Sequence, residues 1–224
     1  MLVVRREAPV GELVVTPPDF PAPTMVVARP SDGAVVLGST QPEADFDAAA
    51  VAATGRSLVR RRSGGGAVFV GPGRQLWVDF FVPAADPLFD RDVGRAAAPL
   101  GEAWRAALAD CGLDPALLAV HRGGLVAAPY SRQLCFLGLG PGEVTFGRRK
   151  VVGLSQRRNR AGAWFFTMAP LVSAPTEEAA LLALDPDERT RAAAALASGV
   201  VAPALDPEAL EAALRRHLER LGGR

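Results

Sequence analysis

Short apolar runs separated by turns that contain Pro and Gly dominate residues 24–172 and predict β-strands there. The expected strands are Thr24–Ala28, Ala34–Leu37, Ala67–Val70, Gln75–Val82, Leu134–Leu137, Glu143–Phe146, Lys150–Ser155 and Ala163–Met168, with shorter β-like pieces at Met1–Arg5 and Glu12–Thr16. The turn Pro30-Ser31-Asp32-Gly33 predicts that the strands on either side of it form a hairpin.

Helical spacing replaces this pattern in four segments. Between Asp90 and Cys111, apolar residues recur every three or four positions, which is typical of an amphipathic helix. The other expected helices are Asp45–Ala53, Thr176–Ala197 with an interruption near Pro186, and Pro207–Leu221. Strands and helices mix without the regular alternation of a doubly wound fold. The pattern therefore predicts an α+β fold, with helices packed on a mainly antiparallel or mixed sheet.

The length of 224 residues suits one domain, residues 1–224, with its motifs in a core at about 24–172 and C-terminal helices at 176–221. An apolar fraction of 49% describes a globular protein, and a net charge of +1 argues against a protein that coats nucleic acid. The first residues lack the apolar core of a signal peptide, and no run approaches the roughly 20 apolar residues of a membrane span. We expect a cytoplasmic protein with no membrane partner and no nucleic-acid partner.

Lys150 is the only lysine among 25 Lys and Arg residues, and it lies in the stretch Gly147-Arg148-Arg149-Lys150-Val151-Val152-Gly153. An ammonium is a compact point charge with a tunable pKa, unlike a guanidinium, so Lys150 is a candidate working residue. Strand alternation places Lys150 and Val152 on one face, and Gly153 permits close approach of the backbone. The alternatives are a lysine that survived by chance in an arginine-rich chain, a solvated basic face, or a nucleic-acid patch. Sparse aromatic residues argue against the last.

A glycine run, Ser63-Gly64-Gly65-Gly66, follows three arginines and leads into an expected strand. Glycines allow positive φ angles, and successive free N–H groups form an anion-binding nest. The arginines add charge that suits a carboxylate or phosphate. The spacing is neither that of a P-loop nor that of a dinucleotide fingerprint. The alternative is a glycine-rich hairpin with solvated arginines.

Cys135 precedes Phe136 and lies fifteen residues before Lys150. A thiol near an ammonium has a lowered pKa and becomes a better nucleophile, whereas a buried cysteine is otherwise a small apolar residue. Neither the two cysteines nor the two histidines have the spacing of metal ligands, so no metal site is expected.

Together these stretches resemble the lipoate–protein ligase and octanoyltransferase family. The family's Arg-Arg-x-Ser/Thr-Gly-Gly-Gly-Ala-Val motif is similar to residues 60–68. Its Gly-Arg-Lys-Val-x-Gly-Ser-Ala-Gln motif is similar to residues 147–156, with Leu154-Ser155 in place of Ser-Ala and one extra arginine. The resemblance spans residues 24–172. It implies the class II synthetase-like catalytic domain that this family shares with biotin protein ligases.

The resemblance implies that the glycine loop cradles the carbonyl and phosphate region of an acyl-adenylate or its equivalent, and that Lys150 holds the acyl carbonyl oxygen. The acyl chain would lie in an apolar tunnel between strands. The residues assigned to acyl or adenylate binding are Arg60, Arg61, Ser63, Gly64, Gly65, Gly66, Ala67, Val68, Val152, Gly153 and Ser155.

The resemblance also implies the partner. The acceptor would be the lysine of a lipoyl domain on a 2-oxoacid dehydrogenase subunit or of glycine-cleavage H protein. Such domains tend to be acidic, so Arg157, Arg158 and Arg160 are expected to dock one. The group attached would be lipoate or octanoate, with biotin as an alternative because the domain is shared.

Two mechanisms occur in the family that the chain resembles. Ligases adenylate lipoate with ATP and magnesium, whereas one octanoyltransferase branch forms a thioester on a cysteine in a Cys-Phe loop, fifteen residues before its lysine. Cys135 and Lys150 match that spacing, and Gly142-Glu143-Val144 is more similar to that branch's Tyr-Glu-Leu than to the ligases' Asn-Asp-Leu. We also expect no counterpart of the accessory C-terminal domain of large ligases, because only about fifty residues follow the last motif strand. We therefore expect acyl transfer with Cys135 and Lys150 as catalytic residues and acyl carrier protein as a donor.

Three departures from the family's pattern stand against a simple transfer of function. Val70 and Thr167 occupy the positions of two histidines, which removes both as general bases. The family's first helix, with its Asn-x-Ala-x-Asp-Glu pattern, has no counterpart in the short Pro-rich N-terminus. The alternatives are an ATP-dependent ligase that works with a separate accessory protein, and a non-catalytic module that binds an acyl-adenylate or a lipoyl domain.

Overall fold

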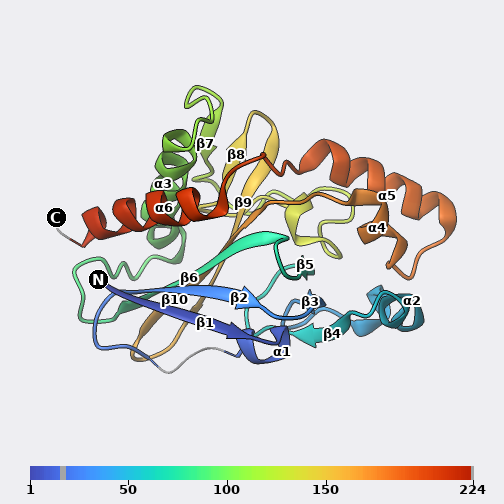
Figure 1. The fold of residues 1–224 in the computed structure, drawn as a ribbon, viewed down its shortest axis with the longest axis horizontal. Coiled ribbons are helices and arrows are strands. Elements are labelled where there is room, and N and C mark those ends of the chain that lie inside the picture. Colours follow the sequence, from blue (N-terminus) through green and yellow to red (C-terminus); the bar gives the residue numbers. More distant parts are fainter. Residues whose placement is uncertain (16–18, 223–224) are drawn as a thin grey trace.

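Two β-sheets organise the chain in the computed structural model, which describes residues 1–15 and 19–222 (Figure 1). Within these residues the larger sheet has seven strands. In order across the sheet they are β1 (Leu2–Ala8), β2 (Thr24–Pro30), β6 (Gln75–Pro83), β10 (Gly162–Pro170), β9 (Arg149–Arg158), β8 (Val144–Phe146) and β7 (Leu118–Val120). β1 and β2 are parallel, and the other neighbours pair antiparallel. The prediction of an α+β fold with a mainly antiparallel, mixed sheet is confirmed.

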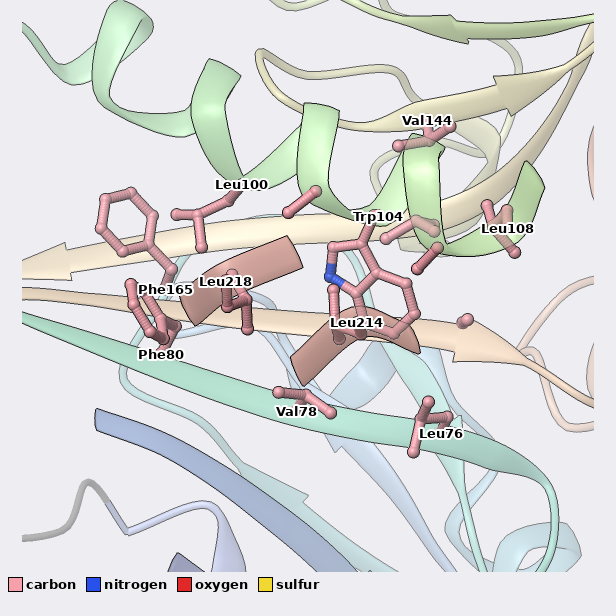
Figure 2. Close-up of a cluster of buried hydrophobic side chains, with 14 of the residues drawn as sticks. Leu76, Val78, Phe80, Leu100, Trp104, Leu108, Val144, Phe165, Leu214 and Leu218 are labelled. Carbon is pink, nitrogen blue, oxygen red and sulfur yellow. The ribbon is translucent and has the colours of Figure 1, made fainter. Parts of the chain in front are cut away.

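Two helices, α3 (Val93–Asp110) and α6 (Pro207–Leu221), cover one face of the larger sheet (Figure 1). Figure 2 shows Trp104 of α3 among Leu214 of α6 and strand residues such as Val78. Trp104 is 1% exposed, and removing such a buried indole costs about 3–5 kcal/mol. α3 begins where the Asp92 carboxylate accepts a hydrogen bond from the Arg95 N–H, which satisfies a donor that the first turn leaves free.

The smaller sheet consists of β4 (Ser57–Arg60), β3 (Ala34–Leu37) and β5 (Val68–Val70), with β3 in the middle. Its side chains pack on the face of the larger sheet that α3 and α6 leave uncovered, where Val36 and Val70 lie in one apolar cluster with Trp77 of β6. The remaining elements are α1 (Val10–Leu13), η1 (Glu43–Asp45), α2 (Ala48–Ala53), η2 (Cys135–Leu137), α4 (Pro175–Ala180) and α5 (Pro186–Gly199). α4 and α5 lie at the end of the molecule away from the two termini (Figure 1).

The expected hairpin around Pro30–Gly33 is wrong. β2 joins the larger sheet between β1 and β6, whereas β3 joins the smaller sheet, so the turn connects two sheets. The turn residues specify that the chain reverses its direction. The strands that β2 and β3 pair with are decided by how each strand is buried in its own sheet.

Two other expected elements differ from the structure. Leu134–Leu137 is not a strand: Leu134 forms an isolated bridge with Ala67, and the 3₁₀ turn η2 follows it. The Glu12–Thr16 piece contains the end of α1, and Thr16 lies outside the described residues. The interruption expected near Pro186 in the helical segment Thr176–Ala197 is confirmed, since α4 ends at Ala180 and Asp185 caps α5, which starts at Pro186. Among the described residues, no helix is both long enough and apolar enough to cross a membrane.

Candidate active site

Three segments that carry expected site residues meet between the two sheets: the glycine loop after β4, the turn η2, and β9. Two backbone hydrogen bonds join the first two segments, since Ala67 N–H donates to the Gln133 carbonyl (2.8 Å) and Cys135 N–H donates to the Ala67 carbonyl (2.9 Å). The hydroxyl oxygens of Ser63 and Ser155 are 3.0 Å apart, which links the glycine loop to β9. Hydrogen bonds therefore join these three segments, which are distant in sequence, into one continuous surface.

Lys150 lies on β9 with 3% of its side chain exposed. Its Nζ donates to both oxygens of Glu143, at 2.9 and 2.8 Å, and to the carbonyls of Cys135 (2.9 Å) and Gly138 (2.8 Å). Glu143 also accepts from the N–H groups of Gly140 (2.7 Å) and Leu154 (3.0 Å). A buried ion pair persists when such bonds satisfy both charges. Lys150 thus fastens the turn that carries Cys135.

Phe136 fills the space that Gly153 leaves empty. A Cβ atom on Gly153 would lie 3.1 Å from the Phe136 Cζ atom, and the centre of the Phe136 ring is 5.0 Å from the Lys150 Nζ. A cation at that distance from an aromatic ring is attracted to it. The group that lies close to the Gly153 backbone is therefore the protein's own Phe136 ring.

The arginines before the glycine run are bound to the protein's own backbone. Arg61 donates to the carbonyls of Val36 (3.1 Å), Gly64 (2.7 Å) and Gly66 (2.8 Å), and to the Ser63 hydroxyl (3.1 Å). One of its terminal nitrogens lies 3.9 Å from the Cys135 Sγ. The guanidinium therefore shapes the loop and brings a positive charge to the thiol.

Arg60 likewise donates to the carbonyls of Gly38 (2.9 Å) and Gln41 (2.6 Å), so it braces the neighbouring loop.

Two positions of the glycine loop do not suit a side chain, one because of close packing and one because of its backbone angle. A Cβ atom on Gly66 would lie 2.9 Å from the Cys135 nitrogen, and Gly65 has a φ of +96°. A Cβ atom on the neighbouring Gly38 would lie 1.8 Å from the Gly65 carbonyl oxygen. By contrast, no atom lies within 4 Å of the place of a Cβ on Gly64. Glycine is therefore required at positions 38, 65 and 66 but not at position 64.

Cys135 lies at the junction of two cavities. A narrow cavity of about 60 Å³ runs between the sheets and is lined mainly by apolar side chains, among them Val36, Val70, Trp77 and Phe166. A larger cleft of about 680 Å³ is lined by Gly64–Gly66, Lys150, Glu143 and the segment 131–133. Cys135, Leu154 and Ser155 line both cavities. Cys135 thus lies where a mainly apolar cavity meets a cleft with several polar side chains in its walls.

A buried carboxyl group lies next to the wall of the narrow cavity. Trp77 donates from its indole nitrogen to Asp79 at 2.7 Å, and Asp79 is 1% exposed. Burial raises the pKa of Asp79 to about 7, while the Trp77 hydrogen bond and the charge of Arg6 oppose this rise.

The sequence matches the family model of the lipoyl protein ligase A/B catalytic domain over residues 16–202. The chain belongs to this family. The family predicted from the two motifs is therefore confirmed. A comparison with the sequences of curated proteins gave no match.

Solved structures of lipoate protein ligases share the fold. A bi-partite lipoate protein ligase from Thermoplasma acidophilum, described with its E2 lipoyl domain, has a TM-score of 0.76 at 19% identity, over 98% of this chain and 82% of that chain. A T. acidophilum protein with bound lipoic acid has a TM-score of 0.64 at 18% identity, over 98% and 95%. A lipoate-protein ligase A bound with ATP has a TM-score of 0.64 at 17% identity, over 98% and 94%.

Against the family's pattern, both missing histidines have structural replacements. Val70 is 0% exposed and lines the apolar cavity, and the Thr167 hydroxyl donates to the Val78 carbonyl in the core. Neither side chain can accept a proton from a substrate amine at neutral pH.

Among the expected site residues, Val152 lies apart from the cavities, buried in the core under α3 and α6. Sequence reasoning missed the pairing of Glu143 with Lys150 and the closeness of Gly38 to the loop. The Gly142-Glu143-Val144 motif singled out Glu143 but did not predict its partner.

No group of three or more His, Cys, Asp or Glu residues that could hold a metal ion occurs within the described ranges 1–15 and 19–222.

Proposed function

We propose that the protein attaches an octanoyl or lipoyl group to the lysine of a lipoyl domain and carries the acyl group as a thioester on Cys135. The observation that carries this proposal is the position of Cys135, which lines both the apolar cavity and the cleft. An acyl chain bonded to the thiol would lie in the cavity, with its carbonyl facing the cleft.

The proposed reaction has two steps. The Cys135 thiolate attacks the carbonyl carbon of an acyl thioester donor, a carbon–sulfur bond forms, and the donor's thiolate leaves and takes a proton. The acceptor's neutral amine then attacks the Cys135 thioester, the amide bond forms, and the Cys135 thiolate is released while the amine's proton passes to solvent. Such covalent catalysis splits one difficult transfer into two easier ones.

Positive charge near the thiol supports the first step. The Arg61 guanidinium is 3.9 Å from the Cys135 Sγ, so a fixed positive charge lies beside the sulfur that attacks the donor. Lys150 holds the Cys135 carbonyl from inside the turn. We propose that its ammonium exchanges one of its two carbonyl acceptors for the acyl oxygen, where negative charge develops in the transition state.

Lipoyl domains of 2-oxoacid dehydrogenase subunits, or glycine-cleavage H protein, are the proposed acceptors. Support comes from the similar bi-partite ligase that was described with its E2 lipoyl domain. Arg132 is exposed and lines the cleft, and Arg62 is exposed beside the apolar cavity, so both suit an acidic acceptor. Arg158, at the other end of β9 from Lys150, is about 26 Å away along the strand. We therefore propose docking over Arg62 and Arg132 in place of the Arg157–Arg160 segment.

The second candidate function is that of an ATP-dependent lipoate–protein ligase that forms lipoyl-AMP. The cleft of about 680 Å³ beside the glycine loop favours it, because this space suits a nucleotide and a structurally similar ligase binds ATP. On this route Cys135 would only line the pocket, and magnesium would accompany ATP.

Transfer to a purified lipoyl domain, followed by mass spectrometry with two donor mixtures, tests the proposal. We expect octanoyl–acyl carrier protein without ATP to modify the lipoyl domain, and Cys135→Ser to abolish the product. Lipoate with ATP and magnesium as the only effective mixture, together with an active Cys135→Ser variant, would establish the ligase instead. No product from either mixture would leave a binding module.

A further inference from the structure

A second small cavity lies behind the apolar cavity. It measures about 40 Å³, and its walls include Phe69, Leu134, Pro170 and Leu196. Three side chains, Val68, Phe136 and Met168, line both cavities and separate them. Removal of this partition would join the two spaces into one longer pocket.

The strand β10 passes from one cavity to the next. Phe166, Met168 and Pro170 alternate along β10 and therefore share one face of it. Phe166 lines the first cavity, Pro170 lines the second, and Met168 lines both. The second cavity therefore continues the first one along the strand.

Met168 is the centre of the partition. Its pairing partner on β9 is Gly153, which has no side chain, and the Phe136 ring occupies the space beside Gly153. Its pairing partner on β6 is Trp77, which lines the first cavity. A methionine is flexible enough to close an irregular gap between two aromatic rings.

The far end of the second cavity is polar. Arg74 and Glu178 line it and form a salt bridge at 3.2 Å, with 17% and 18% of their side chains exposed. An apolar chain that passed Met168 would be covered by apolar walls until it reached this ion pair. Room for a few more methylene groups thus exists beyond the partition.

We propose that Met168, together with Val68 and Phe136, forms a partition that ends the acyl pocket and sets the length of the acyl chain that the protein accepts. This inference rests on the proposed function. Each further methylene group that an open partition lets the protein bury favours binding by roughly fourfold. Opening the partition should therefore favour chains of about twelve carbons over eight.

The test is a competition between octanoyl and dodecanoyl donors for transfer to a lipoyl domain, read as the ratio of the two products by mass spectrometry. Equimolar acyl carrier protein thioesters are used in one series, and equimolar free acids with ATP and magnesium in the other. We expect Met168→Ala to raise the ratio of dodecanoyl to octanoyl product at least about tenfold, since not all the added burial is realised.

Two controls isolate the partition. Met168→Leu keeps a bulky side chain there and should leave the ratio near that of the unmodified protein. Val14→Ala enlarges the first cavity at a residue that follows α1 and lines only that cavity, so it should lower both products without changing their ratio. Val68→Ala opens the partition from β5 and replaces Met168→Ala if that variant unfolds at the assay temperature.

The outcomes separate this inference from the proposed function. An unchanged product ratio in both Met168→Ala and Val68→Ala, with octanoyl transfer intact, would overturn the partition and leave the function standing. Absence of acyl product from the unmodified protein in both series would overturn the function and the partition with it.

Discussion

Lys150 is bonded both to the turn that carries Cys135 and to Glu143, so one side chain combines a structural and a proposed catalytic role. A lysine satisfies this site because its three donors converge on one nitrogen that four acceptors surround. A guanidinium spreads its donors over a plane and does not fit the same point. We expect Lys150→Arg to lose at least about 100-fold in transfer, in keeping with losses for other groups that stabilise an oxyanion. A normal rate in steady-state assays would contradict the role of the ammonium.

A pair of variants separates the two roles of Lys150. Glu143→Leu leaves the buried ammonium without its counter-ion and should reduce the free energy of unfolding by about 3–5 kcal/mol. The double variant Glu143→Leu, Lys150→Met removes both charges and should recover much of that loss in urea denaturation, but it should remain inactive. Transfer by the stable double variant would mean that Lys150 acts only in folding.

Asp79 makes stability depend on pH in the direction opposite to that of an ordinary surface carboxylate. Its pKa is raised by burial to about 7, so between the unfolded value of 3.8 and about 7 the native state binds the extra proton. Stability from this group is therefore lost as the pH rises through that window.

The matching variant is Asp79→Asn, which keeps an oxygen that accepts from Trp77. At about 1.4 kcal/mol per pKa unit, we expect Asp79→Asn to gain about 3 kcal/mol relative to the unmodified protein between pH 5 and pH 8. Glu178, whose pKa burial also raises to about 7, titrates in both proteins and cancels in the difference. A difference in unfolding free energy that stays constant over this range would refute the assignment.

At the scale of elements, the glycine loop is positioned by close packing against two neighbouring segments. A side chain at Gly38 would overlap the Gly65 carbonyl, whereas a side chain at Gly64 would meet nothing within 4 Å. We expect Gly38→Ala to displace the loop, lower the melting temperature and reduce transfer at least about tenfold, with a stability loss of about 1–3 kcal/mol, as for overpacking. Gly64→Ala is the matched control for stability and should melt like the unmodified protein. Equal melting temperatures for the two variants would show that the loop is not held in this way.

The elements also show which parts of the fold the sequence predicts. The helix expected at Pro207–Leu221 has those bounds in the structure, because Asp206 caps it and Pro207 starts it. Such signals are local. The hairpin around Pro30–Gly33 failed because the choice between two buried sheets depends on distant strands. The prediction of a strand at Leu134–Leu137 was wrong because these residues form a turn, from which their apolar side chains pack against other elements.

For the site, the sequence predicted residue types and motifs better than their contacts. Motif spacing singled out Lys150, Cys135 and the glycine run, and the structure brings them together around the cleft. The pairing of Lys150 with Glu143 and the bonding of Arg61 to loop carbonyls were not predicted, since both depend on how segments from different strands pack. The arginines looked free to bind an anion in the sequence, yet Arg60 and Arg61 bind backbone oxygens.

At the scale of the whole molecule, positive charge beside the cleft should guide an acidic acceptor to Cys135. We expect Arg132→Glu to slow transfer to a lipoyl domain by about tenfold at low salt, and the defect should shrink as salt increases, because rim charges act mainly on association rates. Arg160→Glu has the same change of charge near the other end of β9 and should have little effect. Measurement of transfer rates at several salt concentrations distinguishes the two surfaces. A larger defect in Arg160→Glu would return docking to the Arg157–Arg160 segment.

In the proposed reaction, an acyl group resides on Cys135 between donor and acceptor. Intact-protein mass spectrometry after mixing the protein with octanoyl–acyl carrier protein, without ATP and without a lipoyl domain, tests it most directly. We expect one added octanoyl group that is absent in Cys135→Ala and disappears when a lipoyl domain is supplied. An unmodified protein that nevertheless transfers octanoate to the lipoyl domain would contradict the claim.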